Sequence, residues 1–95
     1  MIDAFDWDSE KEKANIRKHG VSFSEAASVF YDVLSLTYPD PDHSIMESCD
    51  IIIGLSNKGR LLFVSHIDRG NHIRIISARE TTRTERKQYE EEWKE

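Results

Sequence analysis

The spacing of apolar residues changes its period near residue 32, and this change restricts the possible fold more than any other feature of the chain. Before it, Phe23, Ala26, Ala27 and Phe30 recur at the spacing of one helical face. After it come short segments compatible with β-strands, separated by turns that contain glycine or proline. The sequence therefore predicts an α+β fold in which helices precede a sheet.

Three helix starts are predicted by one repeated pattern, a Ser or Thr followed three residues later by Glu. Such a pair can form a capping box, in which the hydroxyl and the carboxylate satisfy free backbone N–H groups. The three pairs are Ser9 with Glu12, Ser22 with Glu25, and Thr82 with Glu85. We expect helices over residues 9–19, ended by Gly20, over residues 22–31, and from about Thr82 onward. In the last helix, Tyr89 and Trp93 lie four residues apart and should pack together across the sheet.

Four strands are expected between the second and the last helix. They cover residues 33–38, 50–56, 60–68 and 72–78, and the segment 39–42 stops the first of them. Tight turns at residues 57–59 and 69–71 join the later strands, so the four should form an antiparallel meander. Phe5 and Trp7 either add a short edge strand or hold the first helix in place.

Length and composition limit the class of protein. A chain of 95 residues fits one domain, 1–95. Cys49 is the only cysteine, which excludes an intramolecular disulfide and a cysteine-based zinc site. The acidic N-terminus lacks the apolar region of a signal peptide, and the longest apolar run is only Ile51 to Ile53. We therefore expect a cytoplasmic protein with no membrane partner.

Charge is distributed unevenly along the chain. The formal net charge is −5, yet residues 57–88 contain eight basic and three acidic side chains, a local balance of +5. The other residues carry a balance of −10. A phosphate-binding surface requires local positive potential rather than a basic protein, so an RNA partner remains compatible with this acidic chain. Solvation of exposed faces explains the same basic residues equally well.

Motifs across most of the chain resemble those of BrnT-family toxins. In the first half they are Phe5-Asp6-Trp7-Asp8, the run from Asn15 through Lys18-His19-Gly20-Val21 to Ala26, and Phe30-x-Asp32. In the second half they are Gly54-Leu55-Ser56-x-x-Gly59-Arg60-Leu61-Leu62, Arg74-Ile75-Ile76-Ser77-Ala78-Arg79, and Glu85-Arg86-x-x-Tyr89-Glu90. The resemblance implies a RelE-like fold and an endoribonuclease that arrests translation. It also implies a BrnA-type antitoxin, which binds the toxin and represses the operon through its own DNA-binding domain.

Metal-free RNA cleavage needs an acid, a base and cations that bind phosphate, and four residues are the catalytic candidates. Arg79 is the first, because it ends the last strand and a guanidinium can bind two phosphate oxygens. Arg60 follows the hairpin turn and would assist. Lys18 and His19 close the first helix and are candidates for acid–base work. Alternative roles are pairing with nearby glutamates for Arg79, solvation of the strand start for Arg60, and capping for Lys18 and His19.

Further basic residues are candidates for binding the RNA backbone. They are Arg74, Arg83, Arg86 and Lys87. Arg74 should lie on the opposite face of its strand from Arg79 if the strand is regular, since side chains alternate along a strand. Neither a cofactor nor a metal is expected, because the histidine and carboxylate spacings match no common metal motif.

Several other polar residues have ordinary structural explanations. His43, His66 and His72 are expected to be surface or hydrogen-bonded histidines. Glu25 can serve as a general base, but a capping box accounts for it without chemistry. Tyr89 can supply a phenol near the site, although core packing explains it equally.

Three residues depart from the pattern of the family. Cys49 and Asp50 stand where an arginine and an aromatic residue are common, and Glu80 stands where basic residues continue. These changes favour an alternative function, a weak or inactive toxin homologue that binds an antitoxin in operon autoregulation. A generic RNA-binding domain is a third hypothesis, but the strands offer only Phe63 and Tyr38 for base stacking.

Overall fold

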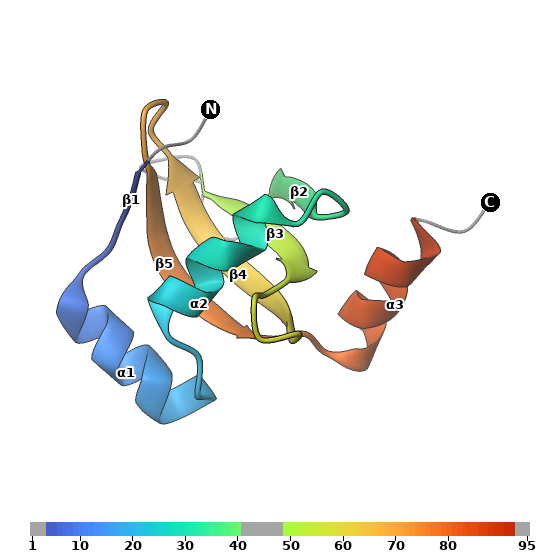
Figure 1. The fold of residues 1–95 in the computed structure, drawn as a ribbon, viewed down its shortest axis with the longest axis horizontal. Coiled ribbons are helices and arrows are strands. Elements are labelled where there is room, and N and C mark those ends of the chain that lie inside the picture. Colours follow the sequence, from blue (N-terminus) through green and yellow to red (C-terminus); the bar gives the residue numbers. More distant parts are fainter. Residues whose placement is uncertain (1–3, 41–48, 93–95) are drawn as a thin grey trace.

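Residues 4–40 and 49–92 are described in a computed structural model, which has an α+β architecture (Figure 1). The elements follow the predicted order of helices, strands and a last helix. They are β1 (Phe5–Asp6), α1 (Ser9–His19), α2 (Phe23–Ser28), a 3-10 helix η1 (Val29–Tyr31), β2 (Leu36–Pro39), β3 (Asp50–Leu55), β4 (Leu61–Asp68), β5 (Ile73–Glu80) and α3 (Arg83–Glu91). None of the helices in the described ranges has the length and apolar character required to cross a lipid bilayer.

The sheet is five-stranded and mixed, with the order β1-β5-β4-β3-β2. Strands β2 to β5 form the predicted antiparallel meander. A fifth strand, β1, pairs in parallel with β5, so the sheet is not the four-stranded antiparallel one predicted, and of the two alternatives for the N-terminal segment the short edge strand is present at Phe5. Phe5 lies opposite Ile73, and its ring packs 5.2 Å from that of Phe30, measured between centroids. This contact holds the N-terminal segment at the edge of β5. Two residues are too few to show a strand period in the sequence.

Helix α1 begins with a different cap from the one predicted. The Asp8 carboxylate accepts hydrogen bonds from the backbone N–H groups of Glu10 (2.8 Å) and Lys11 (3.3 Å). Ser9 is therefore already helical, and Glu12 instead accepts a hydrogen bond from the backbone of Phe23 at 2.9 Å. The C-terminal prediction is confirmed, because Gly20 has a φ of +71° in the left-handed region that glycine enters without a steric penalty.

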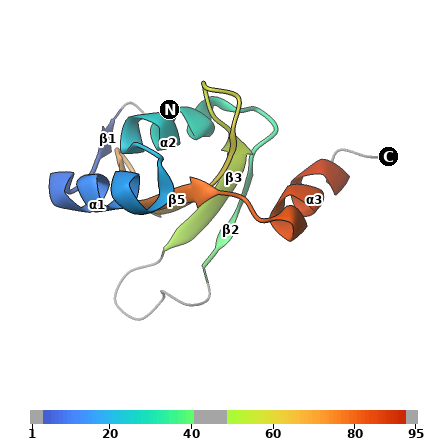
Figure 2. The same cartoon turned by 90° about the horizontal axis from the view of Figure 1, so that it is seen from below.

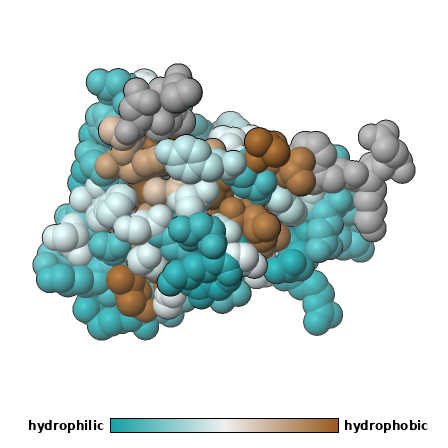
Figure 3. All heavy atoms as spheres, viewed as in Figure 1, coloured by the Kyte–Doolittle hydropathy of each residue, from teal (hydrophilic) through white to brown (hydrophobic). Residues whose placement is uncertain are grey.

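The second helix is shorter than predicted because Asp32 redirects the chain. Its Oδ1 accepts from the backbone N–H of Leu34 at 2.9 Å, and its Oδ2 accepts from that of Leu55 at 2.8 Å. The α-helix gives way to η1, and strand β2 begins at Leu36 rather than at Val33. Val33 is consequently 91% exposed, and brown spheres gather beside this turn in Figure 3.

One face of the sheet packs against α1 and α2, and the other faces α3 (Figure 2). The larger core cluster lies on the α1–α2 side and the smaller one beneath α3. The larger contains Val21, Phe23, Ala26, Val29, Ile52, Leu62, Val64, Ile73, Ile75 and Ala78. The smaller contains Ile51, Ile53 and Leu61, with Phe63 and Tyr89 packed against it. The close approach of η1 requires Gly54, since a Cβ there would lie 2.8 Å from Val29 Cγ1.

A buried asparagine joins α1 to the sheet. Asn15 Nδ2 donates to the carbonyls of Val21 (2.9 Å) and Ala78 (2.8 Å), and Asn15 Oδ1 accepts from the Ala78 N–H at 3.1 Å. These three bonds satisfy the Asn15 amide and the backbone N–H and carbonyl of Ala78, which lie on the edge of β5 beyond its pairing with β1. They fix the end of β5, and with it the position of the next residue, Arg79.

Helix α3 contains no fully buried residue. Its start is the one complete capping box of the three predicted, formed between Thr82 and Glu85. The helix packs on β3 through Tyr89, whose hydroxyl donates to Asp32 Oδ2 at 2.7 Å. The predicted contribution of Trp93 lies outside the described residues, as do His43 and residues 41 and 42.

Candidate active site

The candidate site lies on the face of the sheet that α3 covers in part (Figure 2). Strand pairing aligns Leu36, Ile53, Phe63 and Arg79 in one row across β2 to β5. These four side chains lie opposite the α1–α2 layer, because their neighbours Ile52, Leu62 and Ala78 belong to the larger core. The row thus changes from an apolar floor under α3 to a cationic side chain on β5.

Arg79 is held by three groups. Its Nη1 and Nη2 donate to the two carboxylate oxygens of Glu85 at 2.8 and 3.0 Å, and Nη1 also donates to the Glu80 carbonyl at 3.2 Å. Its guanidinium carbon lies 4.0 Å from the centroid of the Phe63 ring, a cation–π contact. The hydrogen bonds to Glu85 raise the Arg79 pKa further, so the charge is permanent.

These contacts occupy only part of the guanidinium. An arginine has five N–H donors, and the bidentate pair with Glu85 uses the end formed by Nη1 and Nη2. Among residues 4–40 and 49–92, no hydrogen bond engages Nε or the second N–H of Nη2. This edge has the fork geometry that binds two oxygens of a phosphate.

Glu85 fixes the orientation of that guanidinium and begins α3 at the same time. Its Oε1 accepts from the Thr82 N–H at 2.9 Å as well as from Arg79. Burial acts to raise the pKa of the Glu85 carboxyl, but the hydrogen bonds from Arg79 and Thr82 lower it overall. Glu85 is therefore ionised at neutral pH and acts as a poor base.

Arg60 belongs to a second ion pair, on the α1–α2 side of the molecule. Its Nε donates to Glu25 Oε2 at 2.9 Å, its Nη2 donates to Glu25 Oε1, and Nη2 also donates to the Gly20 carbonyl at 3.1 Å. The Ser56 hydroxyl donates to Glu25 Oε2 at 2.7 Å. The capping box predicted for Ser22 and Glu25 is therefore incomplete, because Arg60 and Ser56 occupy the Glu25 carboxylate. Only its Ser22 half forms, with the Ser22 hydroxyl accepting from the Glu25 N–H.

The four predicted catalytic residues are thus divided between two places. Lys18 and His19 end α1 and belong to the helix layer opposite Arg79, with Lys18 exposed and His19 half-buried. The Arg60 bond to the Gly20 carbonyl places this helix end beside the Glu25 pair. The structure brings Lys18, His19 and Arg60 to one region and leaves Arg79 with Glu85 and Phe63 on the other face.

Arg74 lies on the same face as Arg79, contrary to the prediction for a regular strand. The register passes from Ser77 opposite Ser65 to Ile75 opposite His66, so Ile76 has no partner in β4. This β-bulge shifts the alternation by one residue. Arg74 is paired with Asp6 of β1, with Nη1 3.4 Å from Oδ2.

The basic residues of α3 are exposed. Arg83 and Lys87 lie on its solvent side, and Arg86 Nη1 lies 3.7 Å from Glu90 Oε2. An exposed pair of this kind is weak and exchanges readily with other charges. These side chains extend positive charge along α3 from the Arg79 region.

The other polar candidates have structural contacts. His66 is buried against Phe30, with ring centroids 4.7 Å apart, and burial lowers its pKa. His72 contacts Asn71 and Asp6 at the sheet edge. Burial and the bond to Asp32 raise the pKa of Tyr89 to about 12, so its phenol stays protonated. Within the described ranges, no group of three or more His, Cys, Asp or Glu side chains is arranged to hold a metal ion.

Two of the departures from the family pattern lie away from the Arg79 face. Glu80 follows Arg79 in the strand and points to the other side, where its Oε2 is 3.5 Å from Arg60 Nη1. Asp50 lies opposite His66, which belongs to the α1–α2 side. The negative charges that these residues introduce are therefore not on the face that carries Arg79.

No role was predicted for Asp32, and Phe63 was considered only as a residue for base stacking. Asp32 connects η1, β3 and α3, and Phe63 lies under Arg79. The motif Phe30-x-Asp32 carried a signal for the first. The sequence feature that could have identified Phe63 is its place in β4, where it alternates with the buried Leu62 and Val64.

Comparison with known proteins identifies a family and a solved structure that resemble this chain. A family described as "Ribonuclease toxin, BrnT, of type II toxin-antitoxin system" matches residues 7–85. Among solved structures, the chain is similar to the ribonuclease toxin BrnT of Brucella abortus, with 21% sequence identity and a TM-score of 0.65. That likeness covers 85% of this chain and 100% of the other, and at this identity it shows a shared fold. No curated protein matches.

Proposed function

This chain belongs to the BrnT family of ribonuclease toxins of type II toxin–antitoxin systems, as its motifs predicted, and on this premise we propose that it is an endoribonuclease that inhibits translation. We further propose that a BrnA-type antitoxin neutralises it and connects it to operator DNA. The proposal for the reaction depends on one observation, the fixed Arg79 guanidinium with an open edge on the partly covered face of the sheet.

In cleavage of this kind the 2′-hydroxyl of RNA gives its proton to a base, and its oxygen bonds to the adjacent phosphorus. The bond from phosphorus to the 5′-oxygen breaks, an acid protonates that oxygen, and negative charge collects on the other phosphate oxygens during the step. We assign to Arg79 the stabilisation of that charge. Its Nε and Nη2 donors would bind two phosphate oxygens while Glu85 and Phe63 hold the guanidinium plane in place. A cation fixed before the reaction stabilises a transition state without the cost of reorganising around it. This chemistry requires no metal ion.

The exposed cations around Arg79 support binding of the flanking phosphates. Arg83, Arg86 and Lys87 lie on α3, and Arg74 lies on the same sheet face. Each phosphate contact should add to the dependence of RNA affinity on salt, because binding releases counterions. Replacing any one of the four should weaken binding and leave the cleavage position unchanged.

The contacts of Arg60 support a structural role for that residue. Its donors are directed to a buried carboxylate, a backbone carbonyl and Glu80, so its charge is already compensated. Participation of Lys18 and His19 as acid and base remains a prediction. The variants Lys18→Ala and His19→Ala test it through the pH dependence of the cleavage rate.

The experiment for the proposed function compares expression of the wild type and Arg79→Ala without antitoxin. We expect the wild type to arrest growth and to degrade RNA in translating extracts, and Arg79→Ala to do neither while remaining folded by circular dichroism. Harmless expression of folded wild-type protein would contradict the proposal.

The same pairing that orients Arg79 also favours a second candidate function. Glu85 compensates part of the Arg79 charge, so the second candidate is a toxin homologue that binds its antitoxin without cleaving RNA. Purified chain that binds its antitoxin but cleaves neither free RNA nor ribosome-bound RNA would establish this alternative.

A further inference from the structure

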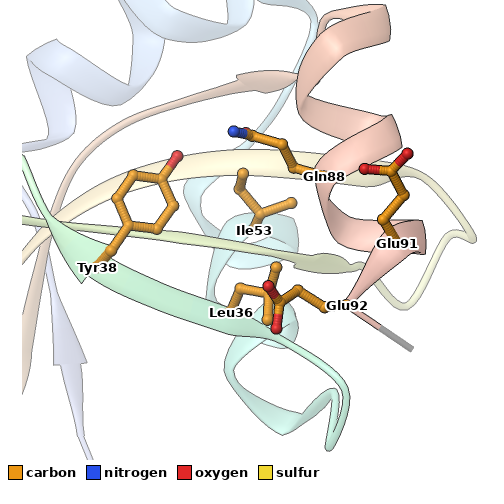
Figure 4. A pocket seen from close by; sticks show the side chains of 6 residues that line it. All are labelled: Leu36, Tyr38, Ile53, Gln88, Glu91 and Glu92. Atoms are coloured by element: carbon orange, nitrogen blue, oxygen red, sulfur yellow. The ribbon is translucent and has the colours of Figure 1, made fainter. Parts of the chain in front are cut away.

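A cavity of about 370 Å³ lies between the β2–β3 edge of the sheet and α3 (Figure 4). Its residues come from both sides. They are Leu36, Tyr38, Ile53, Gln88, Glu91 and Glu92. In Figure 4 Tyr38 and Leu36 come from β2 and Ile53 from β3, while Gln88 and Glu91 come from α3 and Glu92 from the residue that follows it.

The cavity adjoins the Arg79 region. Leu36 and Ile53 are in the same cross-strand row as Phe63 and Arg79, and Ile53 is directly opposite Phe63. Strands are spaced about 4.8 Å apart, so Ile53 lies two strands, about 10 Å, from the backbone of Arg79. On the helix, Gln88 is one turn beyond Glu85, which holds Arg79. A polymer bound through a phosphate at Arg79 therefore has this cavity beside it.

The chemistry of the walls excludes phosphate and suits an uncharged ring. Leu36 and Ile53 provide an apolar floor, and Tyr38 provides an aromatic wall that is 38% exposed. Burial raises the pKa of Tyr38, so its hydroxyl stays neutral. The rim carries two carboxylates and one amide, and among residues 4–40 and 49–92 no basic side chain lines the cavity. Such a rim accepts N–H donors and repels anions.

We propose that this cavity is a nucleobase subsite of the ribonuclease and that it favours guanine. This proposal rests on the proposed function. RNA-binding proteins hold unpaired bases by stacking on aromatic rings and by hydrogen bonds to the base edges. Guanine presents an N1–H and an amino group side by side, which match a carboxylate accepting two bonds. Adenine and cytosine present an amino group beside an acceptor, and uracil flanks its single N–H with two carbonyls.

The subsite assigns distinct roles to its residues. Tyr38 stacks on the base. At the base edge the Glu91 carboxylate accepts hydrogen bonds, and the Gln88 amide donates and accepts them. Glu92 adds to the repulsion of phosphate. None of these residues would take part in the bond-breaking step, which remains at Arg79. Loss of the subsite should change which phosphodiester is cut and how tightly RNA binds.

Binding can be tested without any cleavage. The four ribonucleoside 3′-monophosphates are titrated into the full chain while amide signals are followed by nuclear magnetic resonance. We expect guanosine monophosphate to bind most tightly and to shift the Gln88 side-chain amide and the Ile53 backbone amide. Tyr38→Ala should weaken this binding about 5- to 150-fold, the range for loss of one stacked base, and Tyr38→Phe should retain it.

Two helix variants supply the matched comparison. Glu91→Gln combined with Glu92→Gln should reduce the preference for guanine. Glu90→Gln, at a glutamate of α3 that is not among the cavity residues, should leave it intact. Equal binding of the four nucleotides, or shifts that occur at Arg79 and not at Gln88, would overturn the proposal. Unchanged binding of guanosine monophosphate by the Tyr38→Ala variant would overturn it as well.

Mapping of cut sites separates this proposal from the function on which it rests. If the wild type cleaves beside guanosines and Glu91→Gln with Glu92→Gln relaxes that choice, the subsite is supported. If the wild type cleaves with no base preference, the nuclease stands and the subsite is wrong. If the wild type does not cleave RNA at all, the proposed function is wrong, and the nucleotide titration alone decides the subsite.

Discussion

Two arginines among the described residues each bind both carboxylate oxygens of a glutamate, but they use different edges of the guanidinium and lie in different surroundings. In the pair of Arg60 with Glu25, the carboxylate side chain is 2% exposed and also accepts from Ser56. In the pair of Arg79 with Glu85, the carboxylate side chain is 17% exposed, and the guanidinium lies over Phe63 on the partly covered sheet face. Both arginines keep about a third of their side-chain surface exposed.

The difference lies in where the unused donors point. Arg60 directs its remaining N–H groups to the Gly20 carbonyl and to Glu80, so the pair connects α1, α2 and two strands. Arg79 keeps an edge open beside the apolar row of the sheet. The same chemical pair therefore serves the fold in one place and, in our proposal, the substrate in the other.

The largest expected effect on stability is at Glu25. Glu25→Ala leaves Arg60 and Ser56 without their acceptor in a buried position, and breaking such a pair costs about 3 kcal/mol in the free energy of unfolding. Urea denaturation measures it. Glu10→Ala, which removes an exposed partner of Lys13, is the control and should cost less than about 1 kcal/mol. A similar small cost at Glu25 would contradict the structural role of this pair.

The next effect concerns activity at Arg79. Arg79→Ala should lower the rate of RNA cleavage at least about 100-fold, as removal of one group that stabilises developing charge commonly does. Its cost in stability should be near 1 kcal/mol, because the lost contacts are only half-buried. Arg17→Ala removes the same charge from the exposed side of α1 and should leave the rate unchanged. Equal losses in the two variants would mean that net charge, not the Arg79 geometry, governs the reaction.

The order of elements and the family were predictable from the sequence, because hydrophobic period, glycine at helix ends and ordered motifs are local signals. The capping pattern was less reliable. Thr82 and Glu85 form the full box, but Asp8 displaces Ser9 as the cap of α1, and Arg60 takes the carboxylate of Glu25. A motif states which bonds a residue can make, and tertiary partners decide which it does make.

The position of Arg79 at the end of the last strand was predictable, and the residues that surround it were not. The bulge at Ile76, which brings Arg74 to the same face, depends on pairing with β4 and leaves no local signal in the sequence. The separation of Lys18 and His19 from Arg79 follows from which face α1 covers, a property of the whole sheet. The contact between Phe63 and Arg79 likewise depends on the register of β4 and β5, which places the two residues opposite each other.

Lowering the pH should change the contributions of the two pairs to the free energy of unfolding to different extents, with a smaller effect than that of Glu25→Ala. Hydrogen bonds from Arg60 lower the Glu25 pKa, so its stabilising effect is present above the ordinary value of 4.5 and is lost as pH falls through the lower value in the folded state. The Glu85 pKa is also lowered, against the effect of burial. We expect Glu25→Gln to flatten the decline in the free energy of unfolding between pH 7 and 3.5. Glu85→Gln should flatten it less; the reverse order would contradict the comparison.

The smallest effect is at the attachment of α3. Tyr89→Phe removes the hydrogen bond to Asp32, which still accepts from Leu55, so the loss should be about 1 kcal/mol. Hydrogen exchange should accelerate in residues 83–91 and not in α1. Tyr31→Phe, at a ring that is 71% exposed, is the control. Unchanged exchange in Tyr89→Phe would show that packing alone holds the helix.

The central claim is that the Arg60 pair holds the fold and the Arg79 pair acts on RNA. The most direct test is the rate of RNA cleavage per folded molecule for Arg60→Lys and Arg79→Lys, measured side by side with urea denaturation of the same samples. A lysine keeps the charge and loses the bidentate fork. We predict that Arg79→Lys loses cleavage and keeps its stability, while Arg60→Lys keeps cleavage and loses stability. A stable but inactive Arg60→Lys, or a fully active Arg79→Lys, would contradict the account.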